Sequence, residues 1–222
     1  MNKKIGIASG LLLIVFIVLG WDVYQHHQAA KTSVVVTKTP VSQTKSTAKP
    51  TRKSGKVLIV YFSRKGQNYG GTNLKIGNTH QIANFIAART EGDQYEIVPA
   101  KPYPESYDAT ADQAQKEQNN NSRPQIKNAL PNVSKYHTIF LGYPIWWNEP
   151  PMIVLSFLDR VNLQGKQVVP FVTHGGSGFG DSLSILKKES PHVQFLKGFE
   201  VEGTQAAHAQ KQVNTWLQSL GY

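Results

Sequence analysis

Residues 137–147, HTIFLGYPIWW, place an apolar run directly before an aromatic loop. A run with so few polar residues is typical of a strand that is covered on both faces of a parallel sheet. The arrangement recurs elsewhere, since an apolar run at 56–62 precedes Ser63 and another at 167–172 precedes Thr173. The loops that follow parallel strands meet at one edge of the sheet, where open α/β sheets bind their ligands. The sequence therefore predicts one ligand site built from three loops.

Strands and helices alternate from Lys56 to the end of the chain. One of the helices, at 79–90, has apolar residues at helical spacing and Thr79 in the position of a cap. Five strands and five helices in alternation predict a parallel sheet with helices on both faces. The strands are expected at 56–62, 94–98, 137–143, 167–172 and 193–201, and the helices at 79–90, 105–120, 150–161, 180–190 and 204–221.

The first 55 residues have a different composition. Lys3 and Lys4 precede a run of 17 apolar or small residues, Ile5–Trp21, near the lower end of the roughly 17–25 that cross a bilayer as a helix. We expect residues 1–24 to form an N-terminal transmembrane anchor. A cleaved signal peptide is the alternative, but the nearest small-residue site, Ala29-Ala30, lies far from the apolar run and matches a cleavage site poorly.

A basic tether is expected at 25–55, between the anchor and the folded domain at 56–222. From Ala29 to Gly55 the chain is rich in Thr, Ser, Lys and Pro and has no acidic or aromatic residue, so this stretch cannot bury enough apolar area to fold. The two lysines before the apolar run favour an inside N-terminus. We therefore expect a single-pass protein of the cell membrane with its domain on the extracytoplasmic side.

The charge and composition exclude several classes of function. The net charge is +10, but residues 1–55 hold eight Lys and Arg against one Asp, and residues 56–222 hold sixteen against thirteen acidic residues. A folded domain that carries only +3 does not indicate nucleic-acid binding. The absence of cysteine excludes disulfides, thiolate catalysis and Cys-ligated metals. The histidines have no metal-like spacing, so we expect no metal site.

The first loop has the residues of a phosphate site. Ser63 ends the first apolar run, and Asn78 and Thr79 begin the next helix. Hydroxyl groups, an amide and the free N–H groups of a helix N-terminus bind phosphate without a lysine. The alternative is that Asn78 and Thr79 only cap the helix. The polar, Gly-rich insert at 64–77 matches neither a P-loop nor a dinucleotide fingerprint, and it either folds over the phosphate or is loose.

The second and third loops suit a flat ring. Trp146 and Trp147 follow a buried strand, where two adjacent indoles are awkward to bury unless they cover something flat. The alternative is that one packs on a helix and the other on a partner protein. The third loop, 173–180, has four glycines in eight residues, which lets backbone approach a ligand edge. Its His-Gly-Gly string is also found in hydrolases, but Ser177 does not stand in a nucleophile elbow. Together the loops describe a pocket for flavin mononucleotide (FMN).

These loops, in this order on this alternation, resemble the flavodoxin family, especially bacterial flavodoxin-like proteins with PIWW and THGGSG loops. The likeness covers 56–222 and includes KPYPESYD (101–108), RPQIKN (123–128), FLGYPIWW (140–147) and PFVTHGGSGFG (170–180). It implies a flavodoxin-like three-layer sandwich with a five-stranded parallel sheet in the order 2-1-3-4-5. FMN would bind where the strand order reverses.

The resemblance also implies roles by position. The phosphate would be held by the first loop, Trp146 would stack on the flavin ring, and the third loop would wrap the other edge of the ring. No side chain is expected to be catalytic, although His174 near the ring could tune its redox potential. The expected FMN-binding residues are Ser63, Asn78, Thr79, Tyr143, Pro144, Ile145, Trp146, Trp147, Thr173, His174, Gly175, Gly176, Ser177 and Gly178.

The function expected from this resemblance is that of a membrane-tethered FMN redox protein. Its electrons would come from a reduced donor and pass to a quinone, a flavin or a protein acceptor. The sequence does not decide between an electron carrier and an FMN-dependent oxidoreductase. A second hypothesis is a flavodoxin-like binding or interaction module without turnover.

Overall fold

The computed structural model describes residues 56–222. The predicted anchor at 1–24 and the predicted tether at 25–55 lie outside the described residues. Within residues 56–222, none of the helices has the length and apolar character needed to cross a membrane.

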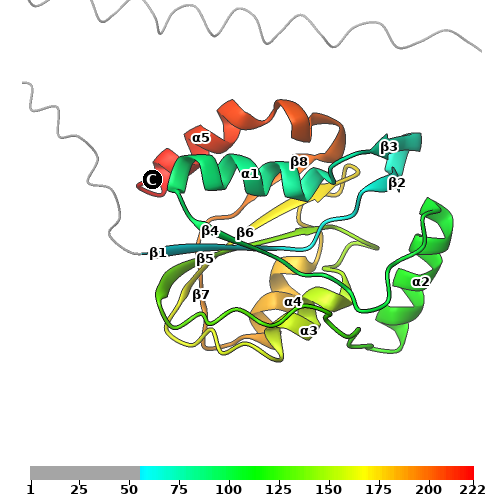
Figure 1. Cartoon of the computed structure of the whole chain (residues 1–222), viewed down its shortest axis with the longest axis horizontal. Coiled ribbons are helices and arrows are strands. Elements are labelled where there is room, and N and C mark those ends of the chain that lie inside the picture. The colour runs from blue at the N-terminus through cyan, green and yellow to red at the C-terminus, as the bar shows by residue number, and fades with distance from the viewer. Residues whose placement is uncertain (1–55) are drawn as a thin grey trace, which may run out of the picture. The chain divides into compact units, whose positions relative to one another are not determined.

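The domain is built on one parallel sheet (Figure 1). Its order is β4-β1-β5-β6, followed by β7 and β8, which both pair with β6. Counted as strands of the fold, this is the predicted order 2-1-3-4-5 with the fifth strand in two pieces. The strands are β1 (Lys56–Tyr61), β4 (Asp93–Glu96), β5 (Tyr136–Pro144), β6 (Gln167–His174), β7 (Gln194–Phe195) and β8 (Phe199–Glu202).

The expectation of one continuous strand at 193–201 is wrong. The N–H of Leu196 donates to the carbonyl of Val168 at 2.9 Å. The next bond of a parallel ladder would need an N–H from residue 170, which is a proline and has none. Pairing therefore stops after β7 and resumes at Phe199, opposite Phe171.

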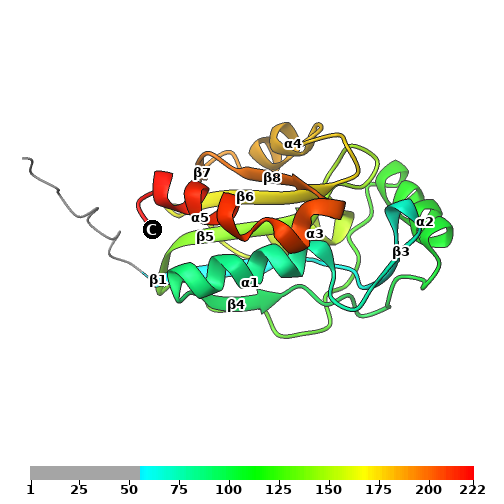
Figure 2. The same ribbon diagram turned by 90° about the horizontal axis from the view of Figure 1, so that it is seen from above.

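Helices cover both faces of the sheet, as predicted. α1 (Asn78–Thr90) and α5 (Gln210–Ser219) lie side by side on one face, and α3 (Met152–Leu158) and α4 (Ser182–Glu189) cover the other (Figures 1 and 2). Alternate residues of β1 enter two separate cores, with Leu58 in the core that includes α3. The fifth predicted helix, 204–221, is a 3-10 helix, η2 (Gly203–His208), followed by α5.

α2 (Tyr107–Asn119) stands apart from the other helices, beyond the carboxyl ends of the strands (Figure 1). The hydroxyl of Ser106 caps it by accepting from the N–H of Ala109. Only two of its residues, Thr110 and Ala114, are buried. A helix with so little of its surface in the core has other surface left to line a cavity.

The insert at 64–77 folds as a hairpin. β2 (Gly66–Asn68) and β3 (Thr72–Leu74) pair in antiparallel fashion around η1 (Tyr69–Gly71). Gly70 and Gly71 have φ values of +74° and +72°, a backbone region that favours glycine. The guanidinium of Arg64 donates to the carbonyls of residues 104–106 and of Gln67, and this fastens the hairpin to the segment before α2.

Candidate functional site

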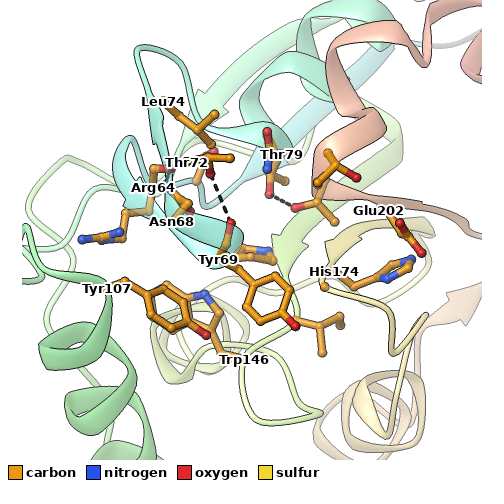
Figure 3. A pocket seen from close by; sticks show the side chains of 18 of the residues that line it. Arg64, Asn68, Tyr69, Thr72, Leu74, Thr79, Tyr107, Trp146, His174 and Glu202 are labelled. Atoms are coloured by element: carbon orange, nitrogen blue, oxygen red, sulfur yellow. Dashed lines mark hydrogen bonds between the residues drawn. The ribbon is translucent and has the colours of Figure 1, made fainter.

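A cavity of about 490 Å³ opens at the carboxyl ends of β1, β5 and β6 (Figure 3). It lies where the strand order reverses between β1 and β5, the usual ligand position in such sheets. Its volume is within the range of about 300–1,000 Å³ that is typical of small-molecule sites. The lining residues come from the first loop and hairpin, α1, α2, the loop after β5, the loop after β6, and the segment from Glu202 to Ala207.

The start of α1 forms one end of the cavity. The residue before its first turn is Gly77, and no side chain of the helix itself caps it. Instead the hydroxyl of Ser63 accepts from the N–H of His80 at 3.1 Å. The expectation that Thr79 caps this helix is therefore wrong. A Cβ on Gly77 would lie 2.2 Å from Ser63 Oγ, so glycine is required for Ser63 to approach the helix this closely.

Two groups of donors remain at this end. The N–H groups of Asn78 and Thr79 belong to the first turn of α1, where a helix offers them no acceptor. The hydroxyl of Ser63 uses an oxygen lone pair on His80, so its hydrogen is still available to a ligand. Such a group of donors suits an anion.

A buried hydrogen bond joins the first and third loops. The hydroxyls of Thr79 and Thr173 are 2.8 Å apart, and either can be the donor. The two residues are 1% and 4% exposed. Thr79 lines the cavity. Its hydroxyl is already bonded to Thr173, and its backbone N–H, in the first turn of α1, is a second donor at this end.

Trp146 forms the core side of the cavity. Its ring centroid is 5.4 Å from that of Phe62 and 5.0 Å from that of Tyr103, and both pairs are edge-to-face. The amide of Gln118 donates to the Trp146 carbonyl at 2.8 Å. The Tyr103 hydroxyl donates to Glu117 at 2.7 Å, and burial followed by the Glu117 charge raises the pKa of Tyr103, so it stays a neutral donor. Trp146 is thus fixed by core and helix contacts.

Trp147 points the other way. Its side chain is 53% exposed, and its indole N–H donates to the Ala111 carbonyl of α2 at 2.9 Å. Trp147 and Asn148 both have positive φ values, +48° and +68°, which is uncommon for residues other than glycine. This tight turn, closed by mutual backbone bonds of 3.0 Å between Trp146 and Glu149, is what separates the two indoles. Backbone of this kind clusters at functional sites.

The third loop is held by His174. Its Nδ1 accepts from the N–H of Gly176 at 2.9 Å, and its Nε2 contacts the carboxylate of Glu200. Because Nδ1 is an acceptor, the ring hydrogen must lie on Nε2 and face Glu200. Both ring nitrogens are therefore engaged within the protein. Redox tuning by His174 stays a prediction.

The structure brings together eleven of the fourteen predicted residues. Tyr143 is not among the lining residues, because its side chain is fully buried and its hydroxyl donates to Ser182 at the start of α4. Gly176 and Gly178 are also outside the lining, and their φ values of +123° and +59° shape the loop instead. The eleven are Ser63, Asn78, Thr79, Pro144, Ile145, Trp146, Trp147, Thr173, His174, Gly175 and Ser177.

Sequence reasoning missed the side of the cavity that faces solvent. Tyr69 of the hairpin and Tyr107 of α2 line it, as do Glu202 at the end of β8 and Thr204 just after it. Residues 56–222 have four exposed large hydrophobic side chains, and three of them, Tyr69, Tyr107 and Trp147, are in this lining. An aromatic residue in a Gly-rich insert was the signal available for Tyr69.

The flavodoxin family model matches residues 56–220. The chain therefore belongs to the flavodoxin family, which confirms the resemblance seen in its sequence. A comparison with curated proteins gave no match.

Solved structures support the same family. A protein assigned as a flavoprotein from Bacteroides eggerthii DSM 20697 is 33% identical, with a TM-score of 0.62 over 75% of this chain and 98% of that one. Another from Bacteroides uniformis ATCC 8492 is 30% identical, with a TM-score of 0.61 over 75% and 99%. A flavoprotein from Lactobacillus acidophilus NCFM, solved in complex with FMN, is 20% identical with a TM-score of 0.55 over 74% and 99%. At that identity the last likeness shows the fold alone.

Proposed function

We propose that the domain binds FMN and acts as a redox flavoprotein. The observation that carries this is the composition of one cavity at the strand-order reversal, with anion donors at one end and aromatic rings beside bare backbone at the other. The donor end takes a phosphate and the aromatic end takes a flat ring. The Lactobacillus acidophilus relative in complex with FMN supports the same cofactor.

Each part of the cofactor has candidate partners in this chain. The phosphate would be held by the N–H groups of Asn78 and Thr79 and by the Ser63 hydroxyl. The ring would be lined by Trp146, and by Gly175 where the third loop offers its backbone. When bound, FMN supplies the electron transfer itself, and the protein supplies binding, orientation and electrostatics.

The electrons come from a reduced donor and pass to a quinone, a flavin or a protein. The second candidate function is a binding module without turnover. The cavity suits both functions, because neither electron transfer by FMN nor FMN binding alone needs a catalytic side chain. The full chain, purified in detergent, should be yellow and release FMN on denaturation. Its flavin should be reduced by a chemical reductant and reoxidised by a quinone. A protein that binds FMN but cannot pass electrons on would favour the binding module, and a colourless protein that takes up no FMN would exclude both.

We also propose that residues 1–24 tether this domain to the cell membrane on its extracytoplasmic side. The support is Lys3 and Lys4 ahead of the apolar run, with the acid-free stretch that follows it. Protease added to intact cells should release the domain by cutting within 29–55. Complete protection until the membrane is broken would reverse the topology.

A further inference from the structure

The cavity has an extension that the proposed FMN contacts leave unused. Its lining comes from the end of the hairpin, the first turn of α1 and the segment that begins at the end of β8. In Figure 3, Leu74 and Glu202 lie on either side of Thr79, which belongs to the anion end of the cavity. The extension therefore offers room for a group attached to the far side of a bound phosphate. Its residues are Leu74, Gln81, Glu202, Thr204 and Ala207.

Glu202 brings an unpaired carboxylate into this extension. It is exposed, and no other residue of 56–222 forms a hydrogen bond or an ion pair with its side chain. The two basic residues of the lining are engaged elsewhere, since Arg64 donates to backbone carbonyls and His174 contacts Glu200. A carboxylate does not hold a phosphate, because like charges repel, but it accepts hydrogen bonds from hydroxyl groups.

Two neutral donors lie near Glu202. A Cβ added to Gly203 would be 2.5 Å from Asn78 Nδ2, so the chain after β8 passes directly beside the Asn78 amide. Neither this amide nor the hydroxyl of Thr204 bonds to another residue within 56–222, and both residues line the cavity. The extension thus combines donors that suit a second phosphate with an acceptor that suits hydroxyl groups.

Leu74 and Ala207 add apolar surface to the extension. Leu74 ends β3, and Ala207 belongs to η2, which packs against α1. Apolar surface, a hydroxyl acceptor and phosphate donors are what the base, the ribose and the phosphate of a nucleotide require. In dinucleotide sites a carboxylate commonly accepts from ribose hydroxyls in this way. Glu202 has no comparable partner when the ligand ends at its first phosphate.

We propose that this site also binds flavin adenine dinucleotide (FAD), with the adenylate half in the extension. This rests on the proposed function, because the flavin half takes the position described for FMN. The second phosphate is held by the Asn78 amide and the Thr204 hydroxyl, and the ribose hydroxyls donate to Glu202. The adenine lies against Leu74 and Ala207. Since only FAD gives Glu202 a partner, the extension favours FAD over FMN.

The test measures the affinity of the full-chain apoprotein for FMN and for FAD by calorimetric titration in detergent. It is repeated with Glu202→Gln, which removes the charge at nearly constant size, and with Ala207→Leu, which fills the extension. Gln205→Ala is the matched control, because Gln205 is exposed in the same 3-10 helix and lies outside the cavity lining. The ratio of the two affinities is compared, so that a general loss of folded protein does not affect the result.

The unaltered chain should bind FAD at least as tightly as FMN. Glu202→Gln should lower the affinity for FAD relative to FMN about tenfold, because hydrogen bonds to a charged acceptor become weaker neutral ones. Ala207→Leu should lower it by at least about tenfold through overlap with the adenylate, and Gln205→Ala should leave it unchanged. The inference is overturned if the unaltered chain binds FAD more weakly than FMN, or if Glu202→Gln and Ala207→Leu change both affinities equally. An unaltered chain that binds neither flavin overturns the proposed function instead.

Discussion

The cavity has two walls that differ in how they are attached to the protein. The inner wall, Ser63, Thr79, Trp146 and Thr173, is bonded to the start of α1, to other loops or to core rings. The outer wall, Tyr69, Tyr107 and Trp147, is the exposed aromatic surface on the hairpin, α2 and the tight turn. Inner-wall residues serve the fold as well as the site. Outer-wall residues contribute little to the cores, so the fold does not explain why they are aromatic, whereas the proposed flavin site would.

Trp146 and Trp147 sharpen this comparison most, because they are neighbours in sequence on different walls. Trp146→Ala should destabilise the apoprotein by about 3 kcal/mol, since it removes a ring packed on Phe62 and Tyr103. Trp147→Ala loses one exposed hydrogen bond and should cost less than about 1 kcal/mol. Urea unfolding of the two apoproteins measures the difference. Equal costs would mean that the two walls are not distinct.

Replacing the same two residues should also have different effects on FMN affinity and on flavin fluorescence. Trp146→Ala should weaken FMN by at least about tenfold and raise the fluorescence of the bound flavin, because a stacked indole quenches it. Trp147→Ala should do less. Titration of each apoprotein with FMN, followed by fluorescence, gives both values. If Trp147 alone controlled quenching and affinity, the assignment of Trp146 to the ring would be wrong.

The buried pair Thr79–Thr173 gives the next largest effect. Thr79→Val should cost about 1–3 kcal/mol, because the Thr173 hydroxyl is left buried without its partner. The double variant Thr79→Val/Thr173→Val should cost less than the sum of the singles, which a double-mutant cycle measures.

Thr79→Val also tests which group of Thr79 serves the phosphate. The variant keeps its backbone N–H, so the preference for FMN over riboflavin should survive. A loss of that preference would show that the hydroxyl, rather than the N–H, holds the phosphate.

Replacing His174 should have a smaller effect than replacing Thr79, and the effect should be on the redox potential of the bound flavin. Its Nε2 faces Glu200, and its Nδ1 holds the N–H of Gly176 in the third loop. His174→Ala should lower the potential of the bound flavin while changing oxidised FMN affinity less. Loss of one interaction of about 1 kcal/mol corresponds to a shift on the order of 20 mV for a two-electron couple. Glu200→Gln is the control, since it keeps the ring and removes the charge. An unchanged potential in both variants would exclude a tuning role.

The sequence predicted the fold well, because each buried strand is marked by an apolar run within its own residues. Continuous apolar runs mark buried parallel strands, and they placed β1, β5 and β6 to within a few residues. The break at 196–198 depends instead on Pro170 of the neighbouring strand, a pairing that residues 193–201 do not contain. The start of α1 shows the same limit, because Ser63, fifteen residues earlier, caps it in place of Thr79.

The sequence likewise predicted the inner wall of the site better than the outer wall. The inner wall comes from strand ends, so its residues could be read from their position after apolar runs. Tyr143 was the exception, since its neighbours line the cavity but its own side chain points to Ser182. The outer wall depends on how the hairpin at 64–77 folds back, which Arg64 fixes through carbonyls some forty residues away. Backbone acceptors leave no signature in a sequence. The aromatic residue in the Gly-rich insert was therefore the one signal for Tyr69, and no signal placed Tyr107 in the outer wall.

The smallest expected effect comes from removing residues 1–55. β1 begins at Lys56, the lining of the cavity begins at Ser63, and both walls belong to 56–222. A protein starting at Lys56 should therefore be soluble, with an unchanged FMN affinity and an apoprotein stability within about 0.5 kcal/mol of the full chain. The matched deletion replaces 66–74 by a short glycine loop, which removes Tyr69 and part of the outer wall and should weaken FMN. The assignment of the site to these two walls would be wrong if the N-terminal deletion lost FMN and the hairpin deletion did not. The site would then depend on a segment outside both walls.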